Sequence, residues 1–141
     1  MDFIKGLLVL FFFPFMLYSQ QFGDSKSQVR LKLANQFENF PKGWFEDESS
    51  IMGFSESGVI IYGFKKNILT SRGHNTKQLS LNDGYKTMKH YEKKYAKLGL
   101  SIDYFDSQLF ASYSNNHYIA IKLSELDDGT IMLSHIENYD Q

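Results

Sequence analysis

Apolar residues recur along this chain with two periods, one typical of helices and one typical of strands. The first helical segment covers residues 25–39, where four apolar residues form one stripe: Val29, Leu33, Phe37 and Phe40. Asp24 or Ser25 can cap its first turn, and Pro41 ends it. A strand-like alternation also runs through residues 29–33, so the pattern favours a helix without excluding a strand.

A second and clearer helix is expected over residues 83–98. Its stripe at helical spacing is mainly aromatic: Tyr85, Met88, Tyr91 (or Glu92), Tyr95 and Leu98. Ser80 or Asn82 can cap the N-terminus of this helix. Gly99 stands where a C-terminal cap favours a residue with positive φ.

Short strands separated by turn residues make up most of the remaining chain. Residues 51–55 and 58–64 predict a hairpin, and the unbroken apolar run of its second strand favours a central strand covered on both faces. Residues 71–76 are polar, include a glycine, and are expected to form the longest loop. Four strands then follow the second helix as an antiparallel meander: 100–105, 109–114, 117–123 and 130–137.

This order of elements predicts the fold class. Helix, strands, helix and strands in succession indicate an α+β fold: a mainly antiparallel β-sheet, a meander of short strands, with two helices packed on one face. A chain of 141 residues is expected to form one domain. A duplication of a helix–hairpin unit stays open, because the order of elements repeats while no residue-level repeat is visible.

The first residues have the pattern of a secretion signal. A positive charge precedes 13 mainly apolar residues, 6–18, which match a signal peptide in length and fall short of the roughly 20 needed to cross a bilayer. Cleavage is expected after Ser19 or Gln20. The chain then divides into a cleavable signal peptide, residues 1–19, and a single small α+β domain, residues 20–141. The alternatives are an uncleaved anchor and a buried first helix; no transmembrane helix is expected after signal removal.

The lack of cysteine narrows both the chemistry and the compartment. It excludes disulfides, thiolate metal sites, iron–sulfur clusters and thiol nucleophiles. An exported domain without disulfides relies on its core, which fits a bacterial protein of the periplasm, cell surface or medium better than a small secreted animal module. The sequence has no phosphate loop, dinucleotide fingerprint or nucleophile elbow. We therefore expect no cofactor, no catalytic residue and no metal site.

Charge is unevenly distributed, although the net charge is only −1. Residues 65–97 carry nine Lys or Arg and two acids, whereas residues 98–141 carry one Lys and seven acids. The polar face of the second helix is therefore basic and can meet an acidic protein or an anionic envelope polymer. The alternative is a solvated helix face balanced by the acidic turns of the same domain, since exposed ion pairs add little stability.

These patterns predict a small exported non-enzymatic protein, a binding or interaction module of the cell envelope or secreted space. The expected contacts are basic residues of the helix face and of the polar loop: Lys86, Lys89, Lys93, Lys94, Lys97, Arg72 and His74. Nucleic acid is not expected as a partner, because the tyrosines of the helix fall on its core side, where bases cannot stack on them. The oligomeric state is left open.

Two other functions stay open. His117 and His135 share the parity of the apolar residues in neighbouring strands, so with Asp103 or Glu137 they could serve a small hydrolase or metal-dependent enzyme. A structural envelope component is the third possibility. Three aromatic residues have no place in the predicted core, and an exposed cluster of them would mark a binding surface: Trp44, Phe45 and Tyr139.

Overall fold

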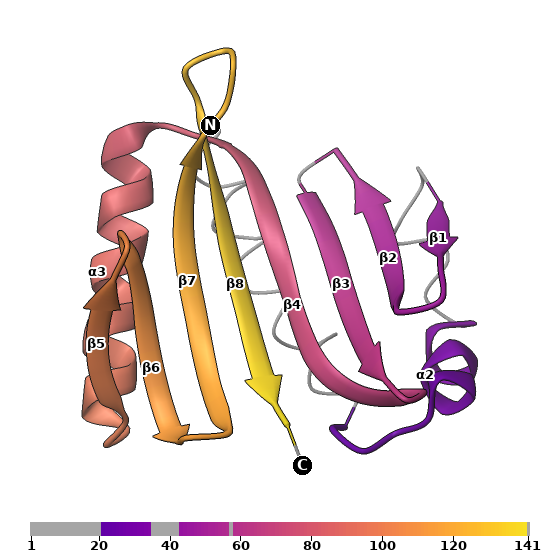
Figure 1. Cartoon of the computed structure of the whole chain (residues 1–141). Helices are drawn as coiled ribbons and strands as arrows, with labels where there is room; N and C mark the ends of the chain where they lie inside the picture. The colour runs from indigo at the N-terminus through magenta and orange to yellow at the C-terminus, as the bar shows by residue number, and fades with distance from the viewer. Residues whose placement is uncertain (1–20, 35–42, 57, 141) are drawn as a thin grey trace.

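A computed structural model describes residues 21–34, 43–56 and 58–140 of the chain (Figure 1). The predicted signal peptide and its cleavage point lie outside these residues. The last part of the first predicted helix, residues 35–39, lies outside them as well. The leader and the proposed domain limits therefore stay predictions.

The described residues form one antiparallel sheet and two helices. Eight strands are hydrogen-bonded in the order β1-β2-β3-β4-β8-β7-β6-β5. Their bounds are Trp44–Glu46 (β1), Ser50–Ser55 (β2), Gly58–Lys65 (β3), Ile68–Leu79 (β4), Ser101–Phe105 (β5), Gln108–Ser114 (β6), His117–Glu125 (β7) and Ile131–Tyr139 (β8). The helices are α2, Lys26–Leu33, and α3, Leu81–Lys97. The predicted α+β class, the hairpin and the late meander are confirmed.

The order of elements repeats once along the chain. A helix followed by a four-stranded meander forms the first half, α2 with β1 to β4, and the same arrangement forms the second half, α3 with β5 to β8. The halves join through β4 and β8, which lie side by side at the centre with His74 opposite His135. The repeating unit is a helix with four strands, which is larger than the helix–hairpin unit considered from the sequence. The difference arises because the sequence analysis did not predict the three-residue strand β1 or the full length of β4.

Both helices begin at capping residues that the sequence predicts. Ser25 caps α2 in a capping box with Gln28. The hydroxyl of Ser80 accepts a hydrogen bond from the backbone N–H of Asp83 at the start of α3. Gly99 follows α3 with φ +88°, the conformation that a C-terminal cap requires.

The buried stripe of α3 differs at its ends from the predicted one. The residues that face the sheet are Gly84, Met88, Tyr91 and Tyr95. Tyr85 and Leu98, expected in the stripe, are instead 58% and 63% exposed. Gly84 faces the sheet in place of Tyr85 because the helix comes close there: a Cβ on Gly84 would lie 3.4 Å from the side chains of Leu123 and Ile131.

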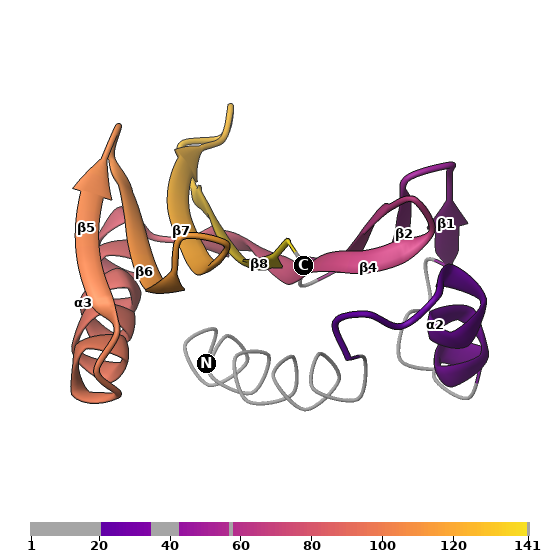
Figure 2. The same cartoon turned by 60° about the horizontal axis from the view of Figure 1, so that its bottom comes forward.

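Both helices pack on the same face of the sheet. One apolar cluster joins α2 to the first half: Val29, Leu33, Ile51, Ile60, Tyr62, Phe64 and Leu69. A second cluster joins α3 to the other half: Met88, Tyr91, Tyr95, Leu100, Leu109, Ala111, Ile119, Ile121 and Leu133. A row of cross-strand neighbours connects the clusters and places them on one face: Ile60, His74, His135 and Ile121. No described helix or strand covers the other face, which we term the helix-free face (Figure 2).

Residues 71–76 are not a loop, and this prediction was wrong. They belong to β4, a strand of 12 residues at the centre of the sheet. Their polar side chains resemble a solvated loop in the sequence, but they have partners in β8. Arg72 lies opposite Glu137, and His74 lies opposite His135. Cross-strand pairing therefore accounts for the polarity that the sequence analysis assigned to solvent exposure.

Candidate binding surfaces

The lysines predicted as contacts form an exposed strip on α3, which we term the basic strip: Lys86, Lys89, Lys93, Lys94 and Lys97. Lys89 lies 3.7 Å from Glu92 in an i,i+3 ion pair, and the Lys94 ammonium lies 5.9 Å from the ring centre of Tyr91. In the described structure no ion pair joins the strip to the acids of residues 98–140. The acidic half therefore does not neutralise the strip by direct contact, and its binding role stays a prediction.

Arg72 and His74 do not belong to the basic strip. Both lie in β4 on the helix side of the sheet, where His74 is 1% exposed and the Arg72 side chain 11% exposed. Arg72 pairs with Glu137 of β8 at 3.1 Å, and its guanidinium lies 4.4 Å from the ring centre of Phe22. The seven residues predicted as contacts are therefore divided between five exposed lysines on α3 and two residues of β4, of which His74 is buried and Arg72 mostly buried.

The surroundings of Arg72 combine charged groups with aromatic rings. His117 of β7 lies 2.8 Å from the second carboxylate oxygen of Glu137, so this carboxylate is held between Arg72 and His117. The His117 ring stacks on Tyr113 with 4.3 Å between centroids, and the Tyr139 ring lies at 4.7 Å. Tyr139, which had no place in the predicted core, thus belongs to a polar and aromatic network that joins the two halves.

His135 has different surroundings, because it lies under α3. Its ring stacks on His74 with 5.2 Å between centroids, and its Nε2 shares a hydrogen bond of 2.6 Å with the hydroxyl of Tyr95. Burial lowers the pKa of His74 to about 3, and the neighbouring His135 acts in the same direction. Burial also lowers the pKa of His135 to about 4. Both rings are therefore neutral at pH 7.

The two histidines of the enzymatic alternative do not share one site. His117 lies opposite Tyr139 and His135 lies opposite Ile121, so the two positions are four residues apart along β7. At the usual strand rise this is roughly 13 Å, whereas a metal–nitrogen bond is about 2 Å. Within the described ranges, no group of three or more His, Asp or Glu side chains is placed to hold a metal ion.

The helix-free face carries an unbroken line of apolar residues across seven strands. Successive cross-strand partners define this apolar row: Phe45, Met52, Ile61, Gly73, Ile136, Ala120 and Phe110. Its members are half-exposed, except for buried Gly73 and exposed Phe45. Polar residues flank the row near its middle, with Ser71 and Asn138 on one side and Ser134 on the other. Apolar surface thus runs through the middle of a face that none of the described helices or strands covers.

The sequence of β3 gave one indication of apolar surface on this face. Apolar residues occupy both alternating sets of positions in β3, so the sequence predicted a strand with both faces covered by other elements. The structure covers Ile60 and Tyr62 with α2, whereas Val59 and Ile61 lie on the helix-free face. The other members of the apolar row were not selected, because a row across a sheet depends on strand order and register, which the sequence does not display.

The helix-free face is concave. Figure 2 shows the upper ends of β5 and β6 at one side of the sheet, and β1 and β2 at the other, reaching above β4 and β8 at the centre. Two glycines permit close approach of the strands on this side. A Cβ on Gly73 would clash with the backbone of His135 and Ile136, and a Cβ on Gly63 would clash with the hydroxyl of Ser71. The apolar row therefore crosses the bottom of a concave surface.

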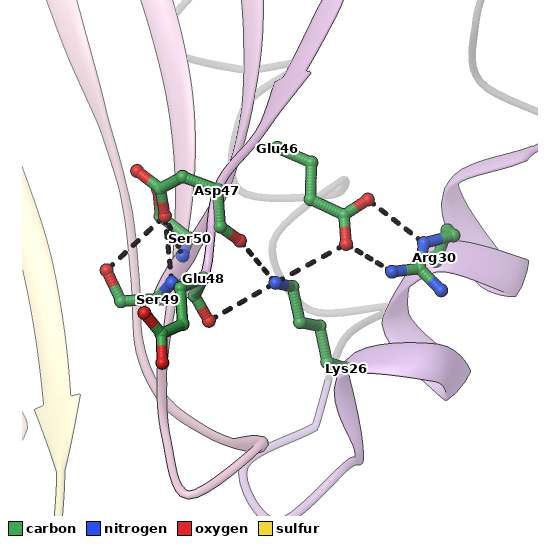
Figure 3. A network of polar contacts seen from close by, with 7 residues as sticks. All are labelled: Lys26, Arg30, Glu46, Asp47, Glu48, Ser49 and Ser50. Atoms are coloured by element: carbon green, nitrogen blue, oxygen red, sulfur yellow. Dashed lines mark hydrogen bonds and ion pairs between the residues drawn. The ribbon is translucent and has the colours of Figure 1, made fainter.

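On the helix side, a polar network fastens α2 to the turn between β1 and β2 (Figure 3). Lys26 donates hydrogen bonds to the backbone oxygens of Asp47 and Glu48. Its ammonium also lies 3.4 Å from the Glu46 carboxylate. The hydrogen bonds from Arg30 are the main cause that lowers the pKa of Glu46. The acidic residues of this turn are exposed, and the turn is tied to α2 through two backbone oxygens and the Glu46 carboxylate.

These features define an α+β protein in which the described helices cover one face of the sheet and no described element covers the other. Comparisons with protein-family models, with curated proteins and with solved structures found no match for the chain. Among the described residues, neither helix is long and apolar enough to cross a bilayer. The function is therefore argued from the surfaces themselves.

Proposed function

We propose that this protein is a small exported binding module, without enzymatic activity, that docks a partner protein on its helix-free face. The apolar row is the observation that carries the proposal. An antiparallel sheet with one solvated face usually places polar residues there. A contiguous apolar strip with polar surroundings is typical of a protein interface, where charges are depleted at the centre.

The chemistry and shape of the row define the partner. Phe, Met, Ile and Ala side chains form the row, with Gly73 at its middle, and a charged residue, Asp103, follows only beyond Phe110 at one end. Seven strands spaced by about 4.8 Å give the row a length of roughly 30 Å. A weakly charged, convex apolar ridge fits this surface. A second copy of the chain is a poor fit as the partner, because its own helix-free face is also concave and two concave faces do not fill each other.

The export part of the proposal has a separate basis. It rests on the apolar pattern of residues 1–19 and on a composition without cysteine. Intact-mass analysis of the protein from its native cells tests it directly. A product that begins at Gln20 or Gln21 is expected, and a product that retains Met1 would contradict it.

The basic strip on α3 is a second candidate contact, for an acidic protein or an anionic envelope polymer. Its five lysines are exposed, and one ion pair is formed by them in the described structure. The strip lies on a helix behind the sheet, whereas the apolar row lies on the helix-free face. Variants in one surface therefore leave the other intact, and the two candidates can be separated by experiment.

Site-specific photo-crosslinking in the native cell envelope tests where the partner binds. A photoreactive side chain at Ile136, in the apolar row, is expected to crosslink one partner protein strongly. The same group at Leu98, equally apolar and exposed at the end of α3, is the matched control and is expected to give little product. A third probe at Lys93 reports on the basic strip.

Two outcomes would contradict docking on the helix-free face. The first is equal crosslinking to the same protein from Ile136 and Leu98. The second is strong crosslinking from Lys93 with none from Ile136, which would assign the contact to the basic strip. Crosslinking of Ile136 to a second copy of the chain would also contradict the proposal, because it would show that the helix-free face mediates self-association.

A further inference from the structure

A small polar pocket lies at one end of the helix-free face, beside the apolar row. Its volume is about 230 Å³, below the range of about 300–1,000 Å³ that encloses drug-sized ligands. The space therefore suits a single small ring. All but two of its lining side chains carry amides or hydroxyls: Thr70, Ser71, Asn115, Asn116, Tyr118, Asn138 and Tyr139.

The floor of the pocket is built by strand register. Ser71, Asn138 and Tyr118 are successive cross-strand partners on β4, β8 and β7, so they stand side by side on the helix-free face. All three are half-buried. Gly63 leaves room for the Ser71 hydroxyl, which a Cβ at that position would displace. Among the described residues, none hydrogen-bonds the amide of Asn138 or the hydroxyl of Ser71, so both are available to a ligand.

One wall of the pocket is held rigidly. The Asn116 amide donates a hydrogen bond of 2.9 Å to the backbone oxygen of Asp140, and its side-chain oxygen accepts one of 2.6 Å from Ser114. A backbone hydrogen bond from Asp140 to Asn116 adds a third tie. Asn115 lies next to this fixed residue and is exposed. A wall formed before binding reduces the entropy that a ligand must otherwise lose by ordering it.

The charges of the pocket cancel. Among its lining residues the one cation is Lys65 and the one carboxylate is Asp140, and they pair at 2.9 Å. An anionic ligand would compete with Asp140 for Lys65. An apolar ligand would remove water from the amides without replacing its hydrogen bonds. The lining therefore favours a neutral ligand that both donates and accepts hydrogen bonds.

We infer that this pocket binds one neutral sugar unit, a hexose or N-acetylhexosamine ring. Sugar hydroxyls donate and accept hydrogen bonds, as do the carboxamides of Asn115 and Asn138. The C–H face of such a ring packs on the ring of Tyr118, which is supported by Phe110 at 6.1 Å. The sugar site is independent of the docking proposal, because its polar contacts come from residues outside the apolar row.

Titration of the ¹⁵N-labelled full chain with glucose, galactose and N-acetylglucosamine tests the site. At least one of these sugars is expected to shift the side-chain amide signals of Asn115 and Asn138 saturably. A Kd on the order of 1 mM is expected, because a ligand of this size makes few contacts. Asn138→Ala is expected to weaken binding about 3- to 10-fold through loss of a hydrogen-bonding amide. Asn82→Ala, an exposed position at the start of α3, is the matched control and is expected to leave the Kd unchanged.

Several results would overturn the inference. One is no saturable shift with any of the three sugars. Another is an unchanged Kd in Asn138→Ala. Equal shifts with glycerol or with inorganic phosphate would show an unselective polar site or an anion site instead. The amide spectrum also reports folding, and Asn115→Ala, on an exposed turn, supplies the second variant if Asn138→Ala does not fold.

Discussion

His74, which is buried, and His135, which is half-buried, are two stacked titratable residues at the centre of the sheet. Their stacked rings join the two halves of the sheet, and Tyr95 connects the pair to α3. A neutral imidazole is tolerated in such a position, whereas a protonated one lacks the water that stabilises its charge. The pair therefore ties the stability of the fold to pH.

Acid is expected to destabilise the fold through these histidines. Burial holds their pKa values at about 3 and about 4, below the ordinary value of 6.5, so the unfolded chain takes up protons first as the pH falls. Their contribution is fully present above about pH 6.5 and is lost as the pH falls through about 4 for His135 and about 3 for His74. Urea unfolding is expected to show a loss on the order of a few kcal/mol across this window.

The double variant His74→Gln/His135→Gln is expected to flatten this pH dependence. His90→Gln is the matched control, because His90 is exposed on α3. If the double variant loses as much stability in acid as the unmodified protein, the pH dependence does not come from His74 and His135.

Removal of the Tyr95 hydroxyl is expected to lower the free energy of unfolding, although the substitution removes a single oxygen atom. Tyr95→Phe leaves Nε2 of His135 without its hydrogen bond, and an unsatisfied buried polar group costs about 1–3 kcal/mol. Tyr104→Phe is the control, since the Tyr104 hydroxyl donates to Glu92 at an exposed site. Equal losses in the free energy of unfolding for the two variants would argue against a special role for the Tyr95 contact.

At the scale of elements, α2 is short and depends on its contacts with the sheet. Its eight residues are too few for a stable isolated helix. Val29 and Leu33 provide the apolar contact, and Lys26 and Arg30 fasten the turn between β1 and β2. The helix and this turn are therefore expected to gain stability from each other.

Lys26→Ala is expected to loosen this end of the sheet. The Lys26 side chain is only 14% exposed and donates to two backbone oxygens, so its loss is expected to cost about 1–2 kcal/mol. Faster amide hydrogen exchange in residues 44–55 measures the effect. Lys65→Ala breaks an exposed ion pair with Asp140 and serves as the control. Equal exchange in both variants would show that Lys26 does not fasten the turn.

Local signals were enough to predict most elements, because caps, turns and periodicity lie within a few residues of each other. Ser25, Ser80 and Gly99 mark helix ends in the sequence as they do in the structure. The central strand β4 was missed, because polar residues such as Arg72 and His74 are typical of a solvated loop in the sequence. Their partners in β8 are about 60 residues away along the chain and are visible only in the structure. The lysines of the basic strip were predicted because they lie on one helix, whereas the apolar row was missed because it depends on the register between strands.

At the scale of the whole molecule, the described part of the chain forms a single layer of two helices on an eight-stranded sheet. Each half supplies one helix, and β4 pairs with β8 to make the sheet continuous. The arrangement leaves one broad concave face with an apolar row at its centre and a polar pocket at its end. A partner protein on this face would cover the apolar side chains that β3 presents there, Val59 and Ile61.

The affinity of the crosslinked partner for two charge variants tests this account most directly. Ile136→Glu places a charge in the apolar row, and the triple variant Lys89→Glu/Lys93→Glu/Lys94→Glu reverses the basic strip. We expect Ile136→Glu to weaken binding by about 30-fold or more, as for a central interface residue, and the triple variant to change it less than about 3-fold. Full affinity in a folded Ile136→Glu variant, with binding lost in the lysine variant, would contradict docking on the helix-free face.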